Sequence, residues 1–276
     1  MYGFIIKKSF CDDWDNLLTV VIVNIIFLFT CLGAAFGFFK VIELFTRSDV
    51  VSAYQFAILG FIVFIAFYIM NIINFAFGEI AAEYAAFNSA NILDFFKKVP
   101  GVLLDALLFS LMVAIIAIVS VFSIWFYFIA SQSRIGVFVG ALLFWIDIFL
   151  ILSLQWFVPI RSYFHNNFRK CLKKCFLIFF DNTWYSIVVF FHTIVMMVIS
   201  VFPFFGMFPS ISGITINKAN AFRIRMYKYD YLEEHPELTS KRQRGQIPWE
   251  ELIYEDRETL GPRKLKSFLF PWKEDK

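Results

Sequence analysis

Long stretches without a single charged residue recur along the first 200 residues of the chain. About 20 consecutive apolar residues suffice to cross a bilayer as a helix. The candidate spans are 17–39, 50–78, 99–130, 135–160 and 183–203, and a lone aspartate interrupts each of the third and fourth. Hydrophobic residues make up 60% of the chain and charged residues 17%, whereas soluble domains carry about 45–50% and about 25%. We therefore expect an all-α, polytopic membrane helix bundle and exclude a water-soluble globule.

A weaker sixth segment, 204–222, contains Pro209 and Lys218. It is expected to be either a short span or a re-entrant piece buried against the others. With six spans, nine Lys and Arg fall inside and three outside, and the remaining thirteen of 25 lie in the inside tail from Lys218 onward. Five spans would place that tail outside, against the positive-inside bias. The charges thus favour about six spans with both termini in the cytoplasm.

Two cytoplasmic segments are predicted to be basic amphipathic surface helices. In 163–180, apolar residues recur every three or four positions and cations occupy the opposite face, with Arg161 just before. The cations of this segment are Arg169, Lys170, Lys173 and Lys174. Such a helix lies in the headgroup plane, apolar side down, with its cations near the anionic leaflet. It is either a structural elbow that sets the topology or a docking helix for a cytosolic partner, and 79–100 is a weaker copy of it.

Charge partitioning also divides the chain into two regions. Residues 1–228 are expected to form the transmembrane helical domain, and 229–276 a charged cytoplasmic tail that is partly disordered. The end of the tail, 264–273, alternates basic and bulky apolar residues. It is expected to dock on the membrane or on the protein itself, or to serve as a partner motif.

Several landmarks along the chain form a recognisable pattern. An aromatic-Pro-apolar-basic exit from a span reads FVPIRSYF at 157–164, and the basic helix that follows reads RKCLKKCFL at 169–177. The segment 95–98, the start of the first span through Asn24, and Pro209 with Asn220 belong to the same pattern. Together these landmarks resemble the YesL-like family of bacterial integral membrane proteins. The chain departs from the family at 31–37, where members often have a Pro- and Gly-containing end to the first span, and in its long tail.

The resemblance covers roughly residues 10–230. It implies a six-span protein of the bacterial cytoplasmic (inner) membrane, associated with carbohydrate-uptake or polysaccharide-use systems. It carries over no catalytic residues.

Ionisable residues within a span are costly and therefore mark functional candidates. Asp147 lies near the middle of the fourth span and His192 near the middle of the fifth. They form either a proton or substrate site, with His192 as the titrating partner, or an interhelical hydrogen bond that fixes helix register. Asp105 is near the inner end of the third span and is expected to reach the headgroups.

Motifs for nucleotide binding, hydrolysis and dinucleotide binding are absent from the sequence. Cys171 and Cys175 with His165 offer too few ligands for a metal site, and Glu79 with Glu83 forms no catalytic acid pair. We therefore expect no enzyme activity, no cofactor and no nucleic-acid partner, and the lipid bilayer as the main partner. The candidate functions are an accessory or permease-like component of solute uptake, a free-standing ion-coupled transporter using Asp147 and His192, or a structural or assembly protein.

Overall fold

The computed structural model describes residues 1–46, 53–131, 133–202, 206–238 and 247–263, and every regular element in these ranges is a helix. In chain order the elements are α1 (Tyr2–Asp15), α2 (Leu17–Thr46), α3 (Ala53–Ala85), α4 (Ile92–Trp125), the π-helical turn η1 (Phe126–Ala130), α5 (Arg134–Leu154), α6 (Phe157–Phe164), α7 (Phe168–Asp181), α8 (Thr183–Ile199), α9 (Ser210–Glu234), α10 (Trp249–Leu252) and α11 (Tyr254–Leu260). The all-α prediction is confirmed for the described residues.

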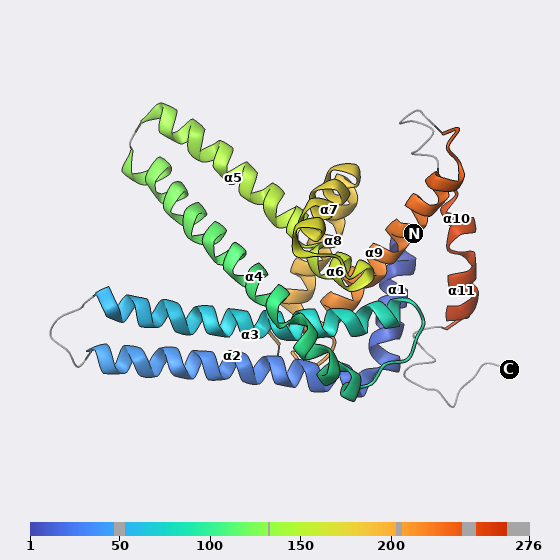
Figure 1. The fold of residues 1–276 in the computed structure, drawn as a ribbon, viewed down its shortest axis with the longest axis horizontal. Helices are drawn as coiled ribbons and strands as arrows, with labels where there is room; N and C mark the ends of the chain where they lie inside the picture. Colours follow the sequence, from blue (N-terminus) through green and yellow to red (C-terminus); the bar gives the residue numbers. More distant parts are fainter. Residues whose placement is uncertain (47–52, 132, 203–205, 239–246, 264–276) are drawn as a thin grey trace.

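Two long helical hairpins dominate the molecule. Figure 1 shows α2 and α3 side by side as one hairpin, and α4 and α5 as a second hairpin at an angle to the first. The two hairpins meet near α1, α6 and α9, and we call this region the base. In the described part of the chain, four helices are long and apolar enough to cross a membrane, and five if the bent pair α7–α8 counts as one span. This agrees with an integral membrane helix bundle, whereas the count of six remains a prediction.

The long helices extend beyond the spans expected from hydropathy. α3 continues from the predicted end at Gly78 through Glu79 to Ala85, because the sequence after Gly78 is rich in alanine and glutamate, which favour helix. The next helix, α4, begins at a capping box. The side chain of Asn91 accepts hydrogen bonds from the amides of Leu93 and Asp94, and Asp94 accepts one from the amide of Asn91.

The α8–α9 turn lies close to the start of α2. Asn24 donates hydrogen bonds to the carbonyl oxygens of Met207 (3.0 Å) and Pro209 (2.9 Å), and its own oxygen accepts one from the Ser212 amide (3.1 Å). Asn24 is about 10 Å along α2 from Leu17, and the whole helix is about 45 Å long. The turn therefore stops well short of the far end of α2, which favours the re-entrant alternative for the segment 204–222.

The N-terminus and the described part of the tail lie at the same end of the molecule (Figure 1). α1 packs along α9, and Lys7 donates a hydrogen bond to the carbonyl of Gly261 (3.3 Å). Arg223 of α9 pairs with Asp256 of α11 at 3.2 Å. Helix α9 runs through the domain boundary expected at 228/229 and ends at Glu234. The predicted docking segment 264–273 lies outside the described residues.

The hydrophobic core is concentrated at this base and not between the spans. Trp156, Phe157, Phe75 and Phe222 are almost fully buried there. Only 17% to 22% of the most apolar stretch of each long helix is buried. The far halves of both hairpins consequently present apolar side chains outward.

Candidate functional site

The two ionisable residues predicted to meet inside the membrane have different surroundings. Asp147 on α5 accepts a hydrogen bond from the hydroxyl of Ser120 on α4, at 2.6 Å. Nδ1 of His192 on α8 is buried and has no hydrogen-bond partner among the described residues. No hydrogen bond or ion pair between Asp147 and His192 is present in the described structure. The aspartate instead fastens α4 to α5.

Arg161 does not belong to the exposed basic surface with which the sequence grouped it. It lies on α6, and its side chain is 13% exposed. Its guanidinium pairs with Glu79 of α3, donates from Nε to Asp105 of α4 at 2.9 Å, and donates to the carbonyl of Gly101 at 2.9 Å. Asp105, which was expected to reach the headgroups, is thus bound to an internal cation, and its side chain is 24% exposed.

The Arg161 cluster is the main ionic contact between the two hairpins. Glu79, whose side chain is 5% exposed, also lies 3.8 Å from Nζ of Lys98 and 3.7 Å from Nδ1 of His165. Desolvating a carboxylate costs several kcal/mol unless cations and hydrogen bonds compensate it. Because α3, α4 and α6 each contribute a member, the cluster fixes how the hairpins meet at the base.

A second polar cluster, between α1 and α9, was missed by the sequence analysis. Lys8, 1% exposed, donates to the Asp12 carboxylate at 2.9 and 3.0 Å and to the carbonyl of Tyr84 at 3.1 Å. Asn220 donates to Asp12 at 2.8 Å and to Ser9 at 3.2 Å. Burial lowers the pKa of Lys8 and raises that of Asp12, and in both cases the attraction between the two opposes the shift.

Asp13 is the member of α1 without such compensation. It is 3% exposed, and its Oδ1 has no hydrogen-bond partner in the described structure. Burial, and then the neighbouring Asp12 charge, raise the pKa of Asp13 well above its usual value. Its Oδ2 lies so close to Gly213 of α9 that an added Cβ would stand 3.0 Å from it and 2.6 Å from Pro209. A glycine is thus required where α1 and α9 come together.

The predicted amphipathic helix exists, but its limits differ from those expected. The segment 163–180 is divided at His165, which adopts a left-handed backbone conformation (φ 49°) and ends α6. On α7, Arg169, Lys170 and Lys173 are exposed. The fourth cation, Lys174, is half-buried and lies 3.3 Å above the ring of Phe164.

The apolar side of α7 packs against the protein. Cys171 and Cys175 are completely buried, and the helix contacts α5 and α6. Burial raises the pKa of both thiols, so they remain protonated and unreactive at neutral pH. Among the described residues, no group of three or more His, Cys, Asp and Glu side chains is placed to hold a metal ion.

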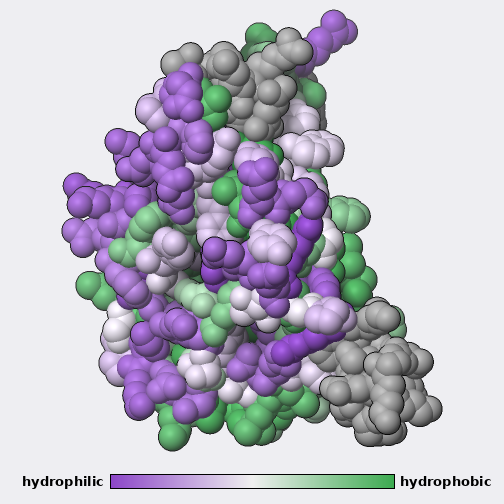
Figure 2. Space-filling view, turned by 90° about the vertical axis from the view of Figure 1, so that its right-hand side faces the viewer, coloured by the Kyte–Doolittle hydropathy of each residue, from purple (hydrophilic) through white to green (hydrophobic). Residues whose placement is uncertain are grey.

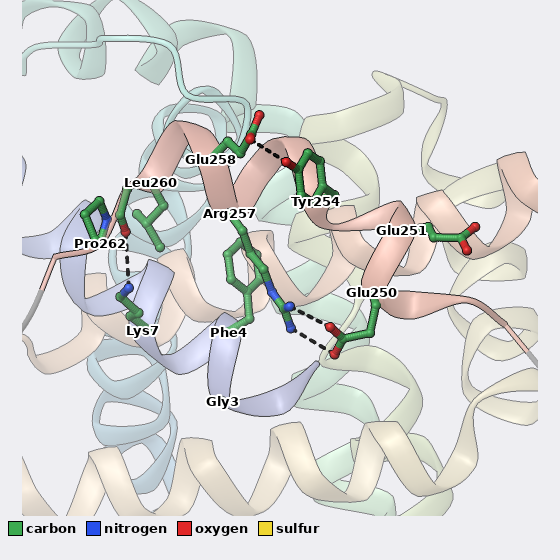
Figure 3. Close-up of a pocket in the computed structure, with 11 residues that line it drawn as sticks. Gly3, Phe4, Lys7, Glu250, Glu251, Tyr254, Arg257, Glu258, Leu260 and Pro262 are labelled. Atoms are coloured by element: carbon green, nitrogen blue, oxygen red, sulfur yellow. Dashed lines mark hydrogen bonds and ion pairs between the residues drawn. The ribbon is translucent and has the colours of Figure 1, made fainter.

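A cleft of about 1140 Å³ separates α1 from α10 and α11. Figure 3 shows Arg257 bound to Glu250, Tyr254 bound to Glu258, and Lys7 reaching across to the carbonyl of Gly261. Figure 2 views this end of the molecule, and the face is largely hydrophilic. The cleft therefore opens on the polar end of the protein, away from the apolar hairpins.

No family model, curated protein or solved structure matches the chain. The resemblance to the YesL-like family remains a prediction.

Proposed function

We propose that the chain is a non-catalytic membrane subunit that acts as an accessory or permease-like component of solute uptake. Carbohydrate is the solute class that the resemblance to the YesL-like family implies. The observation that carries the proposal is the low burial of the spans, 17% to 22% in their most apolar stretches. Helices with such open lateral surfaces are suited to pack against the helices of a partner subunit in the bilayer.

The polar residues of the spans support the same function. Asn71 on α3 donates to Ser110 on α4 at 3.0 Å, and Thr215 on α9 donates to Asn74 on α3 at 2.9 Å. These side chains satisfy one another between helices. Carriers place polar groups along an aqueous path or at a midplane site, whereas here the polar groups hold helices together.

The polar end that carries α1, α10 and α11 is proposed to face the cytoplasm of a bacterial cell, with the spans in its inner membrane. The sequence places Lys and Arg preferentially on that side. In this orientation, the cleft between α1 and α11 is available to the cytosolic parts of an uptake system.

Photo-crosslinking in the native membrane tests the accessory function. A crosslinking amino acid at Phe61 of α3, which is 62% exposed, is expected to capture another integral membrane protein identifiable by mass spectrometry. The same group at Phe157, which is completely buried, is the matched control and should give only crosslinks within the chain. Capture of lipid alone from Phe61 would contradict the proposal.

A free-standing ion-coupled transporter is the second candidate. It is favoured by one observation, the buried and unpartnered Nδ1 of His192 on α8, since such an atom is able to take up a proton or bind a substrate. This function would be established by solute flux into proteoliposomes that is lost in the His192→Gln variant while the protein still assembles normally. Loss of assembly upon replacing Asp147 and His192 together would instead favour a structural or assembly protein.

A further inference from the structure

The exposed face of α7 is basic near the start of the helix and apolar near its end. At about 100° per residue, Arg169, Lys173, Leu177 and Phe180 fall within about 80° of one another around the helix, and Lys170 borders them. We call these five residues the α7 stripe. All are exposed, with Leu177 58% and Phe180 67% exposed. The opposite side holds the buried residues Cys171, Cys175, Ile178 and Phe179.

The three cations of the α7 stripe have no counter-ion among the described residues. Within the described residues, no carboxylate lies within 4.0 Å of Arg169, Lys170 or Lys173. The single acid of α7, Asp181, is bound to Lys228 at 2.6 Å and to the hydroxyl of Tyr229 at 2.8 Å. The stripe therefore presents a local charge of about three units for an external anion.

The apolar half of the stripe leads into a lipid-facing helix. α7 and α8 meet at an angle of 104°, so that if α8 enters the membrane, α7 lies close to the membrane plane. Trp184, at the start of α8, is 72% exposed, and Phe191 further along is 66% exposed. Cations beside a tryptophan and other bulky apolar side chains are the usual composition of the headgroup level.

We propose that the α7 stripe binds anionic phospholipid, with Arg169, Lys170 and Lys173 on the headgroup phosphates and with Leu177 and Phe180 against the upper acyl chain. Charge complementarity selects an anionic ligand. The two apolar side chains on the same face select a lipid over a soluble acidic protein, which would leave them in water. This inference is independent of the proposed function, because it concerns the bilayer and not the partner subunit.

Thermal unfolding of the full chain in nanodiscs tests the proposal. The protein is expected to unfold several degrees higher in discs of phosphatidylcholine with phosphatidylglycerol than in phosphatidylcholine alone, and salt should reduce the difference. The triple variant R169Q/K170Q/K173Q should lose most of this shift. Its unfolding temperature in phosphatidylcholine alone should equal that of the unmodified chain, which shows that the fold is intact.

A matched variant separates the stripe from net charge. K40Q/K97Q/R257Q also removes three exposed cations, each paired with a neighbouring acid, and should keep the full shift. Equal loss of the shift in both triple variants would overturn the proposal, as would retention of the shift in R169Q/K170Q/K173Q. Soluble glycerol phosphate, added to phosphatidylcholine discs, should not reproduce the stabilisation. If it does, the site recognises free phosphate and the lipid assignment is wrong.

Discussion

At the scale of single residues, burial decides which charges matter. Arg161 and Arg169 are eight positions apart and belong to one basic segment of the sequence. One is enclosed by two carboxylates of other helices, and the other is exposed. Asp12 and Asp13 are adjacent, yet only Asp12 has a lysine against it. The buried and uncompensated Asp13 is therefore the residue most sensitive to pH in α1.

Replacing Asp13 by asparagine is expected to stabilise the protein, and to do so by more at pH 8 than at pH 5. The raised pKa means that, above the usual value of 3.8, the folded chain retains a proton that the unfolded chain releases. The stability that the Asp13 proton contributes is present in full below the unfolded pKa. It is lost as the pH rises through the folded pKa, by at most about 1.4 kcal/mol per pH unit. Asparagine carries no such proton, so the pH dependence should flatten.

Unfolding temperatures from pH 5 to 8 in one detergent measure this effect. Asp15→Asn on the same helix is the control, since Asp15 is about half-exposed and should leave the slope unchanged. A slope in Asp13→Asn equal to that of the unmodified chain would show that Asp13 is not the titrating group.

At the scale of elements, a few polar contacts join the helices in addition to the apolar core. Asn24 holds the α8–α9 turn, Ser120 and Asp147 join α4 to α5, and Arg161 joins α3, α4 and α6. In a membrane, apolar side chains meet lipid as readily as they meet each other, so interhelical hydrogen bonds and close packing specify the arrangement. The two hairpins thus depend on a small number of polar anchors.

Arg161→Gln is expected to destabilise the protein by about 3–5 kcal/mol, because it leaves the buried Glu79 carboxylate without its main cation. Arg169→Gln, in zwitterionic lipid, should cost less than about 0.5 kcal/mol, as is usual for an exposed side chain. Denaturant unfolding of both variants provides the comparison. The double variant E79Q/R161Q should recover part of the loss, and a double variant no more stable than Arg161→Gln alone would argue against the ion pair.

At the scale of the whole molecule, the chain consists of two apolar hairpins, a base that contains both apolar and polar contacts, and a polar end formed by α1, α10 and α11. The base contains the buried aromatic core and both polar clusters. The described tail is bound to α9 through Arg223 and Asp256, and to α1 through Lys7 and the carbonyl of Gly261. The far halves of the hairpins expose apolar side chains, as helices that cross a bilayer do. Insertion and folding of the base are therefore separable properties.

Truncation separates these two properties. Removing residues 264–276 should leave membrane insertion intact, measured as the carbonate-resistant membrane fraction, because the apolar helices alone determine insertion. Removing 247–276 should also leave insertion intact but lower the unfolding temperature, because Arg223 loses Asp256 and the surface of α1 is uncovered. Loss of insertion in the shorter truncation would show that the end of the tail is part of the fold.

Hydropathy alone was sufficient to predict the helix-bundle class, the positions of the four long helices and the amphipathic character of α7, because these follow from periodicity and from the length needed to cross a bilayer. Charge pairing was not predictable, since Glu79, Asp105 and Arg161 come from three separate elements. The α1–α9 cluster was missed because its residues are spaced like an ordinary solvated helix face. Whether a polar side chain becomes a surface charge or a buried anchor depends on which distant segment covers it, and only the tertiary structure decides that.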